Sequence, residues 1–370
     1  MNRLIYTILI YLSLPVAIFR ILIKDSKDKS WKQKIKNQLG FVNAVKGKVI
    51  WIHCVSVGEF NAAKPLIDKM FNNFPSHKIV ITTTTITGSK AVKNYYQNKV
   101  IHLFFPFDLP IVIFYFIKSI NPVACILLET EIWPNLITML KKKNIPVMLI
   151  NARLSEKSLH NYRKFSSKLI SPILKQLSII CSQNDYSTER FLSLNVEKKT
   201  IFTTGNLKFD INEAIDINTI QSIKKIIGNR KVIVFASTRD GEEKQIIQSY
   251  IKLQNKFNAL LLIIPRHPER FDEVFDIVCD SGLNVERRSQ NISSKDIDIL
   301  IGDSMGEMMS YYRICDIAFI GGSLSNNGGQ NMLEAASLSK PIIFGPSVYN
   351  FEEITNTLLA NNSAIQVQDA

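Results

Sequence analysis

Residues 316–334 read DIAFIGGSLSNNGGQNMLE, an apolar run that meets a glycine-rich loop and then a helix-like segment. Glycines such as Gly321 and Gly322 adopt positive φ angles without steric cost and let the backbone approach a ligand closely. The unpaired N–H groups at the helix start favour phosphate, and Glu334 in the first turn could accept hydrogen bonds from ribose hydroxyls. The stretch predicts a nucleotide site at the carboxyl edge of a parallel sheet, and the simpler alternative is a tight turn with a helix cap.

Similar apolar runs recur along the chain and alternate with helical patterns. Those before residue 205 lie at 49–55, 78–84, 100–105, 124–128, 147–151, 178–181 and 200–204. Those after residue 230 lie at 231–236, 259–264, 285–287, 298–301, 316–320, 341–344 and 364–367. They are rich in Ile and Val without strict alternation, which is typical of parallel strands buried on both faces. We therefore predict an α/β protein with two Rossmann-like, doubly wound domains and a cleft between them.

The polar stretch 209–229 carries no strong strand, and we place the linker there. The predicted division is an N-terminal anchor at 1–23, a first domain at 24–208 and a second domain at 230–370. The chain stops at Ala370 directly after a strand-like run, where this architecture usually adds a closing helix.

The N-terminal segment 4–23 is almost entirely apolar and just long enough to cross a bilayer. The lysines that follow it would hold the downstream chain on the cytoplasmic side, and no signal-peptide cleavage pattern is present. Pro15 and Arg20 leave an interfacial anchor open beside a spanning one. The structural alternative is an N-terminal helix folded into the first domain.

The first 48 positions contribute +8 of the net charge of +13. Because this charge borders an apolar segment, it indicates an anionic membrane surface. Nucleic acid is disfavoured, since we find no zinc ligand set, recognition helix or aromatic-interleaved basic stripe. The five cysteines form no CxxC pair and lie in or beside apolar runs, as reduced core thiols of a cytosolic protein do. Asp296-Ile297-Asp298 matches a three-letter metal pattern of sugar transferases, which is too short to support a metal site.

Acidic residues follow two strand-like runs of the first domain. HCVSVGE at 53–59 puts Glu59 at a helix start, where its carboxylate could take a proton from an attacking hydroxyl. Glu129 and Glu131 repeat this arrangement; in an extended chain they point to opposite sides, so that only one would face the cleft. Lys208 could neutralise a phosphate or carboxylate at the hinge. The structural alternatives are helix-dipole stabilisation for the acids and a solvated surface lysine.

Two loops of the second domain also carry candidate ligand groups. In PRHPER at 265–270, Arg266 could bind a phosphate in bidentate fashion and His267 could add a hydrogen bond. In GDSMGE at 302–307, backbone groups could contact the edge of a base, unless the loop is an ordinary turn.

Taken in order, these segments resemble the Kdo transferases, where Kdo is 3-deoxy-D-manno-oct-2-ulosonic acid, an acidic sugar of bacterial lipopolysaccharide. The resemblance runs from the N-terminal segment to about residue 352. The matching motifs are HCVSVGE at 53–59, ETEIWPNL at 129–136, NAR at 151–153, GNLKFD at 205–210, ASTRDGEE at 236–243, PRHPER at 265–270, GDSMGE at 302–307, GGQNMLEAA at 328–336 and GPSVYNF at 345–351.

The resemblance implies a GT-B fold, with the acceptor, a lipid A precursor, on the first domain and the donor, CMP-Kdo, on the second. It implies inverting transfer without a metal or another cofactor. By matching motif, Glu59 resembles the general base, and Glu129 and Lys208 resemble positions that support the transition state. The positions matching CMP contacts are Arg266, His267, Met305, Gly306, Glu307, Asn331, Met332, Leu333 and Glu334.

The chain departs from the family pattern at Arg239 and Asp240, where a His-Glu pair is commoner, and at Gln330, where His is common. These departures concern donor contacts rather than the reaction. The implied location is the inner membrane, with both domains on the cytoplasmic side. Two other functions stay open: a GT-B enzyme that uses a UDP-sugar, and an inactive membrane-bound protein that binds a nucleotide-sugar.

Overall fold

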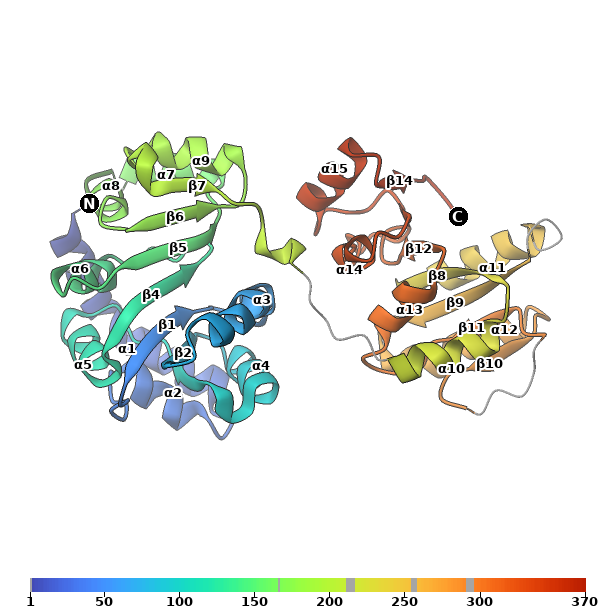
Figure 1. Cartoon of the computed structure of the whole chain (residues 1–370), viewed down its shortest axis with the longest axis horizontal. Coiled ribbons are helices and arrows are strands. Elements are labelled where there is room, and N and C mark those ends of the chain that lie inside the picture. The colour runs from blue at the N-terminus through green and yellow to red at the C-terminus, as the bar shows by residue number, and fades with distance from the viewer. Residues whose placement is uncertain (1, 166, 211–216, 254–257, 291–295) are drawn as a thin grey trace. The chain divides into compact units, whose positions relative to one another are not determined.

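A computed structural model describes residues 2–165, 167–210, 217–253, 258–290 and 296–370. The chain divides into two compact units, Met1–Asp210 and Ile211–Ala370, each of which is described by itself below (Figure 1). Each of the fourteen predicted strands is present, with its ends within two residues of the expected ones.

The first unit contains a parallel sheet in the order β3-β2-β1-β4-β5-β6-β7. Its strands are β1 (Lys48–His53), β2 (His77–Thr83), β3 (Ile101–Phe104), β4 (Pro122–Leu128), β5 (Val147–Ala152), β6 (Ile179–Ser182) and β7 (Ile201–Thr203). The strand order reverses between β1 and β4. In open sheets of this kind, ligands bind outside the carboxyl ends of the strands at such a reversal.

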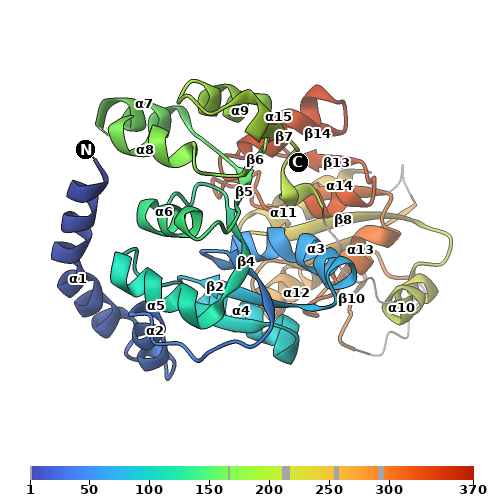
Figure 2. The same ribbon diagram turned by 60° about the vertical axis from the view of Figure 1, so that its left-hand side comes forward.

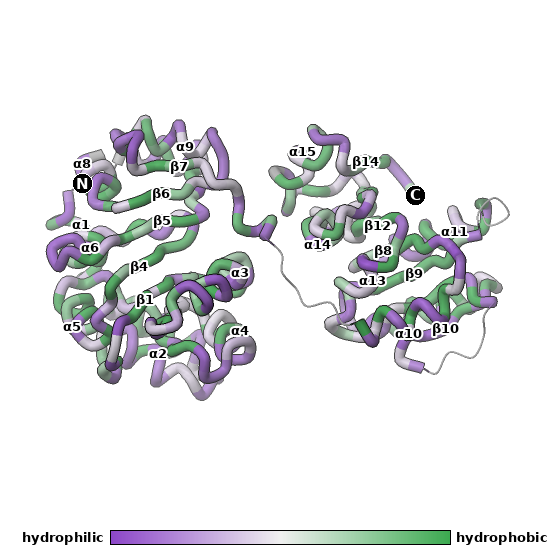
Figure 3. Tube along the Cα trace, viewed as in Figure 1, coloured by the Kyte–Doolittle hydropathy of each residue, from purple (hydrophilic) through white to green (hydrophobic). Residues whose placement is uncertain are grey.

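Helices cover both faces of this sheet. One face carries α3 (Val57–Asn73) and α4 (Ile86–Tyr96), and the other carries α5 (Pro110–Ile120), α6 (Pro134–Lys142), α8 (Ser167–Leu174) and α9 (Asp185–Leu192). The remaining helices are α1 (Arg3–Asp25), α2 (Trp31–Gln38) and α7 (Glu156–Phe165). Because both faces are covered, the strands are apolar along most of their length, as the colouring of Figure 3 shows.

The second unit repeats this plan with the strand order β10-β11-β9-β8-β12-β13-β14. Its strands are β8 (Lys231–Thr238), β9 (Ala259–Pro265), β10 (Val285–Arg287), β11 (Ile299–Ile301), β12 (Ile317–Ile320), β13 (Ile342–Phe344) and β14 (Ala364–Gln366). The helices are α10 (Ile217–Ile227), α11 (Glu242–Leu253), α12 (Phe271–Cys279), α13 (Met308–Ile314), α14 (Leu333–Ser337) and α15 (Glu352–Ala360). The order reverses between β8 and β12, which gives this sheet its own ligand-binding edge.

Two details differ from expectation. The stretch expected as a linker contains α10, whose Ile223 and Ile227 are buried in the core of the second unit. Because its apolar residues recur at helical spacing, the segment forms a helix whose apolar face packs on the second unit. Cys279 is exposed at the end of α12, whereas Cys54, Cys125 and Cys315 are buried; all five cysteines are free thiols.

The N-terminal helix α1 has the length and apolar composition to cross a membrane, and among the described residues it alone meets both criteria. It lies outside α5 and α6 and leads into α2 (Figure 2). Most of its apolar side chains are exposed.

Candidate active site

The first candidate site lies at the reversal point of the first sheet. Glu59 stands in the first turn of α3, directly after β1, and Glu129 follows the neighbouring strand β4. Because parallel strands bring their carboxyl ends to one edge, residues far apart in sequence meet there.

Glu59 is partly buried at this edge, and its Oε2 accepts a hydrogen bond from the backbone N–H of Val55 at 2.8 Å. Burial raises the pKa of Glu59 to about 7, and the nearby charges of Glu129 and Glu131 add to the increase. The Val55 hydrogen bond and the charge of Lys208 act in the opposite direction. A carboxylate with this pKa can both hold and release a proton near neutral pH, as a general base must.

The chain turns at Glu129, which adopts φ of 54°, in the left-handed region. The expectation that the two acids point to opposite sides assumed an extended chain, whereas the chain turns here, and the charges of both acids raise the pKa of Glu59. Glu131 is fixed by its neighbour, since its Oε2 accepts a hydrogen bond from Trp133 Nε1 at 2.8 Å. Three carboxylates therefore gather at one sheet edge.

Lys208 supplies a positive charge to this cluster, with its Nζ 3.4 Å from Glu129 Oε1. It lies in the 3-10 turn η3 (Leu207–Phe209), which packs against α3. Asn151, at the end of β5, accepts a hydrogen bond from the Leu207 backbone N–H at 2.9 Å. Asn206 Oδ1 accepts another from the Lys208 N–H at 3.0 Å. Two asparagines thus fix the turn that presents Lys208.

His53 lies beneath the carboxylate cluster, in the interior of the first unit. It is fully buried and stacks on Phe105, with ring centroids 3.7 Å apart. Its Nδ1 lies 3.0 Å from Thr82 Oγ1, and its Nε2 faces Glu131 Oε2 at 3.7 Å. His53 therefore supports the loop that carries Glu131 from below.

The second candidate site lies at the reversal point of the second sheet, where a buried carboxylate holds the loop after β12. Glu242, fully buried in the first turn of α11, accepts hydrogen bonds from the backbone N–H groups of Arg239, Gly322, Leu324 and Ser325 at 2.7–3.2 Å. The N–H groups that follow β12 are therefore occupied by a protein carboxylate.

Basic side chains border the same loop. Arg266, exposed after β9, donates from Nε to Gln330 Oε1 at 3.3 Å. Arg239 donates to His267 Nε2, and it also lies against Gly322. Arg239, a departure from the family pattern, thus adds a guanidinium to the two basic residues that the sequence singled out.

Glu307 is committed to contacts inside the second unit. Its Oε2 accepts hydrogen bonds from Ser304 Oγ and from Tyr311 OH, the latter at 2.8 Å, and its Oε1 lies 3.1 Å from Arg288 Nη2. Burial alone would raise the pKa of Glu307, but these hydrogen bonds and the arginine charge hold it below its ordinary value. The Glu307 side chain therefore stabilises the loop between β11 and α13.

The other candidates differ in what they can offer a ligand. Met305 is 71% exposed, and Gly306, at φ of 85°, turns the loop that carries it. Met332 and Leu333 are buried in the core of the second unit, so that only their backbone groups face this edge. Their side chains contribute packing.

Asn331 organises the start of α14. Its Oδ1 accepts a hydrogen bond from the Leu333 N–H at 3.1 Å, and its Nδ2 donates to Glu334 Oε1 at 3.0 Å. Glu334 is thereby held in the first turn, as the sequence predicts. Next to these loops an open cavity of about 550 Å³ is lined by residues 324–326 and 346–349 together with Glu352.

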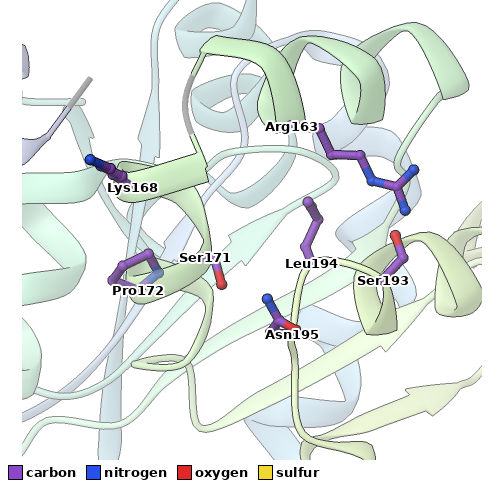
Figure 4. A pocket seen from close by; sticks show the side chains of 7 residues that line it. All are labelled: Arg163, Lys168, Ser171, Pro172, Ser193, Leu194 and Asn195. Atoms are coloured by element: carbon purple, nitrogen blue, oxygen red, sulfur yellow. The ribbon is translucent and has the colours of Figure 1, made fainter.

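A further hollow of about 310 Å³ lies on the first unit, around the ends of α8 and α9 (Figure 4). It is lined by Arg163, Lys168, Ser171, Pro172, Ser193, Leu194 and Asn195. None of the predicted site residues borders it. In the described part of the chain, no group of three or more His, Cys, Asp or Glu side chains is arranged to hold a metal ion.

Comparison with known proteins identifies the family. The family described as 3-Deoxy-D-manno-octulosonic-acid transferase (kdotransferase) matches residues 30–211. The 3-deoxy-D-manno-octulosonic acid transferase of Haemophilus influenzae is 37% identical, over 99% of this chain and 87% of the relative. This chain belongs to the Kdo transferase family. The Kdo transferase of Bordetella pertussis is 32% identical, over 87% of this chain and 76% of the relative.

Solved structures are similar to this Kdo transferase in fold. The UDP-GlcNAc 2-epimerase from Neisseria meningitidis bound to UDP-GlcNAc has a TM-score of 0.52 at 14% identity, covering 85% of this chain and 91% of that chain. MurG of Acinetobacter baumannii has a TM-score of 0.51 at 10% identity, covering 87% of this chain and 85% of that chain. The C-terminal CMP-Kdo binding domain of WaaA from Acinetobacter baumannii is 34% identical, covering 42% and 84%, with a TM-score of 0.39.

The predicted fold and enzyme class are thus confirmed: the chain is a glycosyltransferase of the Kdo transferase family with two doubly wound domains. Sequence reasoning missed Asn151 and Glu242 as residues that shape the sites. Glu242 carried a signal, since it is an acid in a first helical turn, as Glu59 is. Three of its four hydrogen-bond partners lie 80 or more positions away, which no local pattern reveals.

Proposed function

We propose that this Kdo transferase moves Kdo from CMP-Kdo to the lipid A precursor, with inversion at the anomeric carbon and without a metal ion. The observation that carries the proposal is the cluster of Glu59, Glu129, Glu131 and Lys208 at the reversal point of the first sheet. It supplies a carboxylate with a pKa near 7 beside a lysine, which suits the activation of a sugar hydroxyl.

Glu59 is the proposed general base. Its deprotonated carboxylate takes the proton from the acceptor hydroxyl as that oxygen attacks the anomeric carbon of Kdo. The hydrogen bond from Val55 fixes one carboxylate oxygen, which orients the other. Lys208 offsets the negative charge of Glu129, so that an anionic sugar meets less repulsion.

The basic side chains of the second unit are the proposed donor contacts. Departure of CMP leaves negative charge on its phosphate while an oxocarbenium-like centre forms on the sugar. Arg266, Arg239 and His267 lie together and can stabilise that charge. The proposed contacts with the ribose and phosphate of CMP lie at the start of α14. They are the side chains of Asn331 and Glu334 and the backbone of Met332 and Leu333. The loop that carries Met305, Gly306 and Glu307 is the proposed contact with the nucleotide base of CMP.

The decisive experiment mixes the purified chain with CMP-Kdo and lipid A precursor and weighs the lipid product. We expect a mass gain of one or more Kdo units and release of CMP. The experiment is repeated with a metal chelator, and inhibition by CMP is compared with inhibition by UDP. Stronger inhibition by UDP would favour a UDP-sugar donor, and an unchanged lipid with no CMP released would favour an inactive nucleotide-sugar-binding protein.

The family places its members in lipopolysaccharide synthesis, at the membrane. We propose the cytoplasmic face of the inner membrane for this chain. The positive charge of its first 48 residues supports that side, since basic segments stay in the cytoplasm and bind anionic lipid.

A further inference from the structure

The helix α1 lies along the first unit over its whole length. Its partly buried residues recur three or four positions apart, which places them on one face of the helix. They are Tyr6, Thr7, Ile10, Leu14, Ala17, Ile18, Ile21 and Asp25. A helix that only projected from the unit would be shielded near one end, whereas this stripe runs from the first turn to the last.

Hydrogen bonds hold both ends of α1 on the same unit. Near its start, Tyr6 OH donates to Asp108 Oδ2 at 2.9 Å, and Thr7 Oγ1 donates to Asn135 Oδ1 at 3.0 Å. At its end, Asp25 Oδ2 lies 2.8 Å from Lys34 Nζ. Asp108, Asn135 and Lys34 are themselves buried, so these are contacts with the body of the unit.

These contacts conflict with a helix that crosses a bilayer. Tyr6 and Asp25 are separated by about 28 Å along a helix, close to the ~30 Å thickness of the hydrocarbon core. A spanning helix would put them on opposite sides of the membrane. Both residues contact one globular unit, whose polar surface cannot enter the hydrocarbon.

The outer face of α1 is apolar and exposed. Its side chains include Leu4, Ile5, Ile8, Leu9, Leu12, Val16, Phe19 and Ile23, of which Leu12 and Val16 are 70% and 68% exposed. A continuous, exposed apolar face made of these eight side chains marks a site of interaction with a membrane or with another protein. Arg20, Lys24 and Lys27 border its C-terminal end, and this positive charge favours anionic lipid over an apolar protein partner.

We propose that α1 lies flat in the headgroup region of one anionic leaflet, with its outer face in lipid and its inner stripe on the first unit. The chain is then anchored on one side of the membrane and does not cross it. This inference rests on the contacts of α1 and not on the proposed reaction.

The contacts near the start of α1 also connect it to the start of α6. Asp108 accepts hydrogen bonds from the backbone N–H groups of Asn135 and Leu136, at the start of α6, at 3.0 and 2.7 Å. That helix directly follows the loop carrying Glu129. The flat arrangement therefore puts lipid beside the helix that follows the Glu129 loop, which suits the proposed lipid acceptor.

Labelling from either side of the membrane tests the topology. Asn2→Cys and Lys27→Cys are placed separately in full-length chain carrying Cys279→Ser, which removes an exposed thiol. Spheroplasts and inverted inner-membrane vesicles are treated with an impermeant maleimide, and the chain without an added cysteine gives the background. We expect both positions to react in inverted vesicles and neither in spheroplasts. Reaction of Asn2→Cys only in spheroplasts and of Lys27→Cys only in inverted vesicles would overturn the flat arrangement.

Substitutions on the outer face test the lipid contact. Leu12→Glu combined with Val16→Glu leaves the inner stripe intact, and we expect the membrane-bound fraction to fall about tenfold or more. Ile365→Glu, at a residue 62% exposed on the second unit, is the matched control and should leave that fraction unchanged. A wild-type chain found in the soluble fraction, or a double variant that stays fully membrane-bound, would contradict the proposal.

Discussion

Glu59 shows how the environment of a single residue sets its chemistry. Its carboxylate is partly withdrawn from water and faces two further carboxylates, and both effects favour the protonated form. A glutamate on an open surface titrates near 4.3 and would be too weak a base to take a proton from a hydroxyl efficiently at neutral pH. The cluster therefore matches the proton affinity of Glu59 to the proposed reaction.

The pH dependence of transfer follows from this value. Because only deprotonated Glu59 can accept a proton, we expect kcat/KM to fall as the pH drops through about 7. Glu59→Gln should lose about 100-fold or more of the activity, with the remaining rate free of this ionisation. Rates measured at a series of pH values check both points. Near-wild-type activity of Glu59→Gln would remove this residue as the base.

The charged neighbours of Glu59 test the direction in which its pKa is shifted. The charge of Glu131 raises the pKa of Glu59, so that Glu131→Gln should move the acid limb of the pH profile to lower pH. Lys208 lowers that pKa, and Lys208→Met should move the limb to higher pH. The same pH series measures both variants. Shifts in the same direction would show that the acid limb does not report Glu59.

At the scale of elements, both candidate sites depend on side chains that fix a loop of another segment. Asn151 ends β5 and holds the turn η3, which presents Lys208. Glu242 begins α11 and holds four backbone N–H groups, three of them from the loop after β12. Each residue acts through the backbone of a segment to which it is not adjacent in sequence. Replacing either one should disturb a site without removing a group that contacts substrate.

Asn151→Ala tests the first of these. Loss of the hydrogen bond to Leu207 should loosen the turn that carries Lys208 and lower kcat about tenfold, a change of ~1.4 kcal/mol, with donor KM unchanged. Asn195→Ala is the control, because both asparagines have a positive φ, 52° at Asn151 and 65° at Asn195, whereas Asn195 lies at the hollow shown in Figure 4. Equal effects of the two variants would mean that backbone strain, and not the hydrogen bond, explains the loss.

Glu242→Ala tests the second. Four backbone N–H groups would lose their common acceptor, and we expect the second unit to be destabilised by more than about 3 kcal/mol and to bind CMP weakly. Thermal unfolding and CMP titration measure the two effects. Asp276→Ala, at an exposed side chain of α12, should change neither. Wild-type stability of Glu242→Ala would show that the loop holds its shape without this carboxylate.

At the scale of the whole molecule, each unit has its own sheet and its own buried cores. The proposed acid–base chemistry lies on the first unit, and the proposed donor contacts lie on the second. This division suggests that nucleotide binding does not need the first unit.

A chain of residues 211–370 should therefore fold alone and bind CMP as tightly as the full-length protein does. Circular dichroism and CMP titration check this, with Arg266→Ala in the same fragment as the control that should weaken binding. A folded fragment without CMP affinity would mean that part of the nucleotide site belongs to residues 1–210.

The two parallel sheets were predictable from the sequence, because continuous Ile- and Val-rich runs separated by helical patterns leave few other ways to bury apolar surface on both faces. The sequence also placed Glu59, Glu129 and Arg266 at strand ends, where the position along the chain decides the sheet edge. Three further features emerge only in the folded protein: Glu242 accepts hydrogen bonds from the N–H groups after β12, Glu129 and Glu131 both raise the pKa of Glu59, and α1 is held at both ends. These outcomes depend on contacts between segments far apart in the chain, and the turn at Glu129 is a single backbone angle that no periodicity encodes.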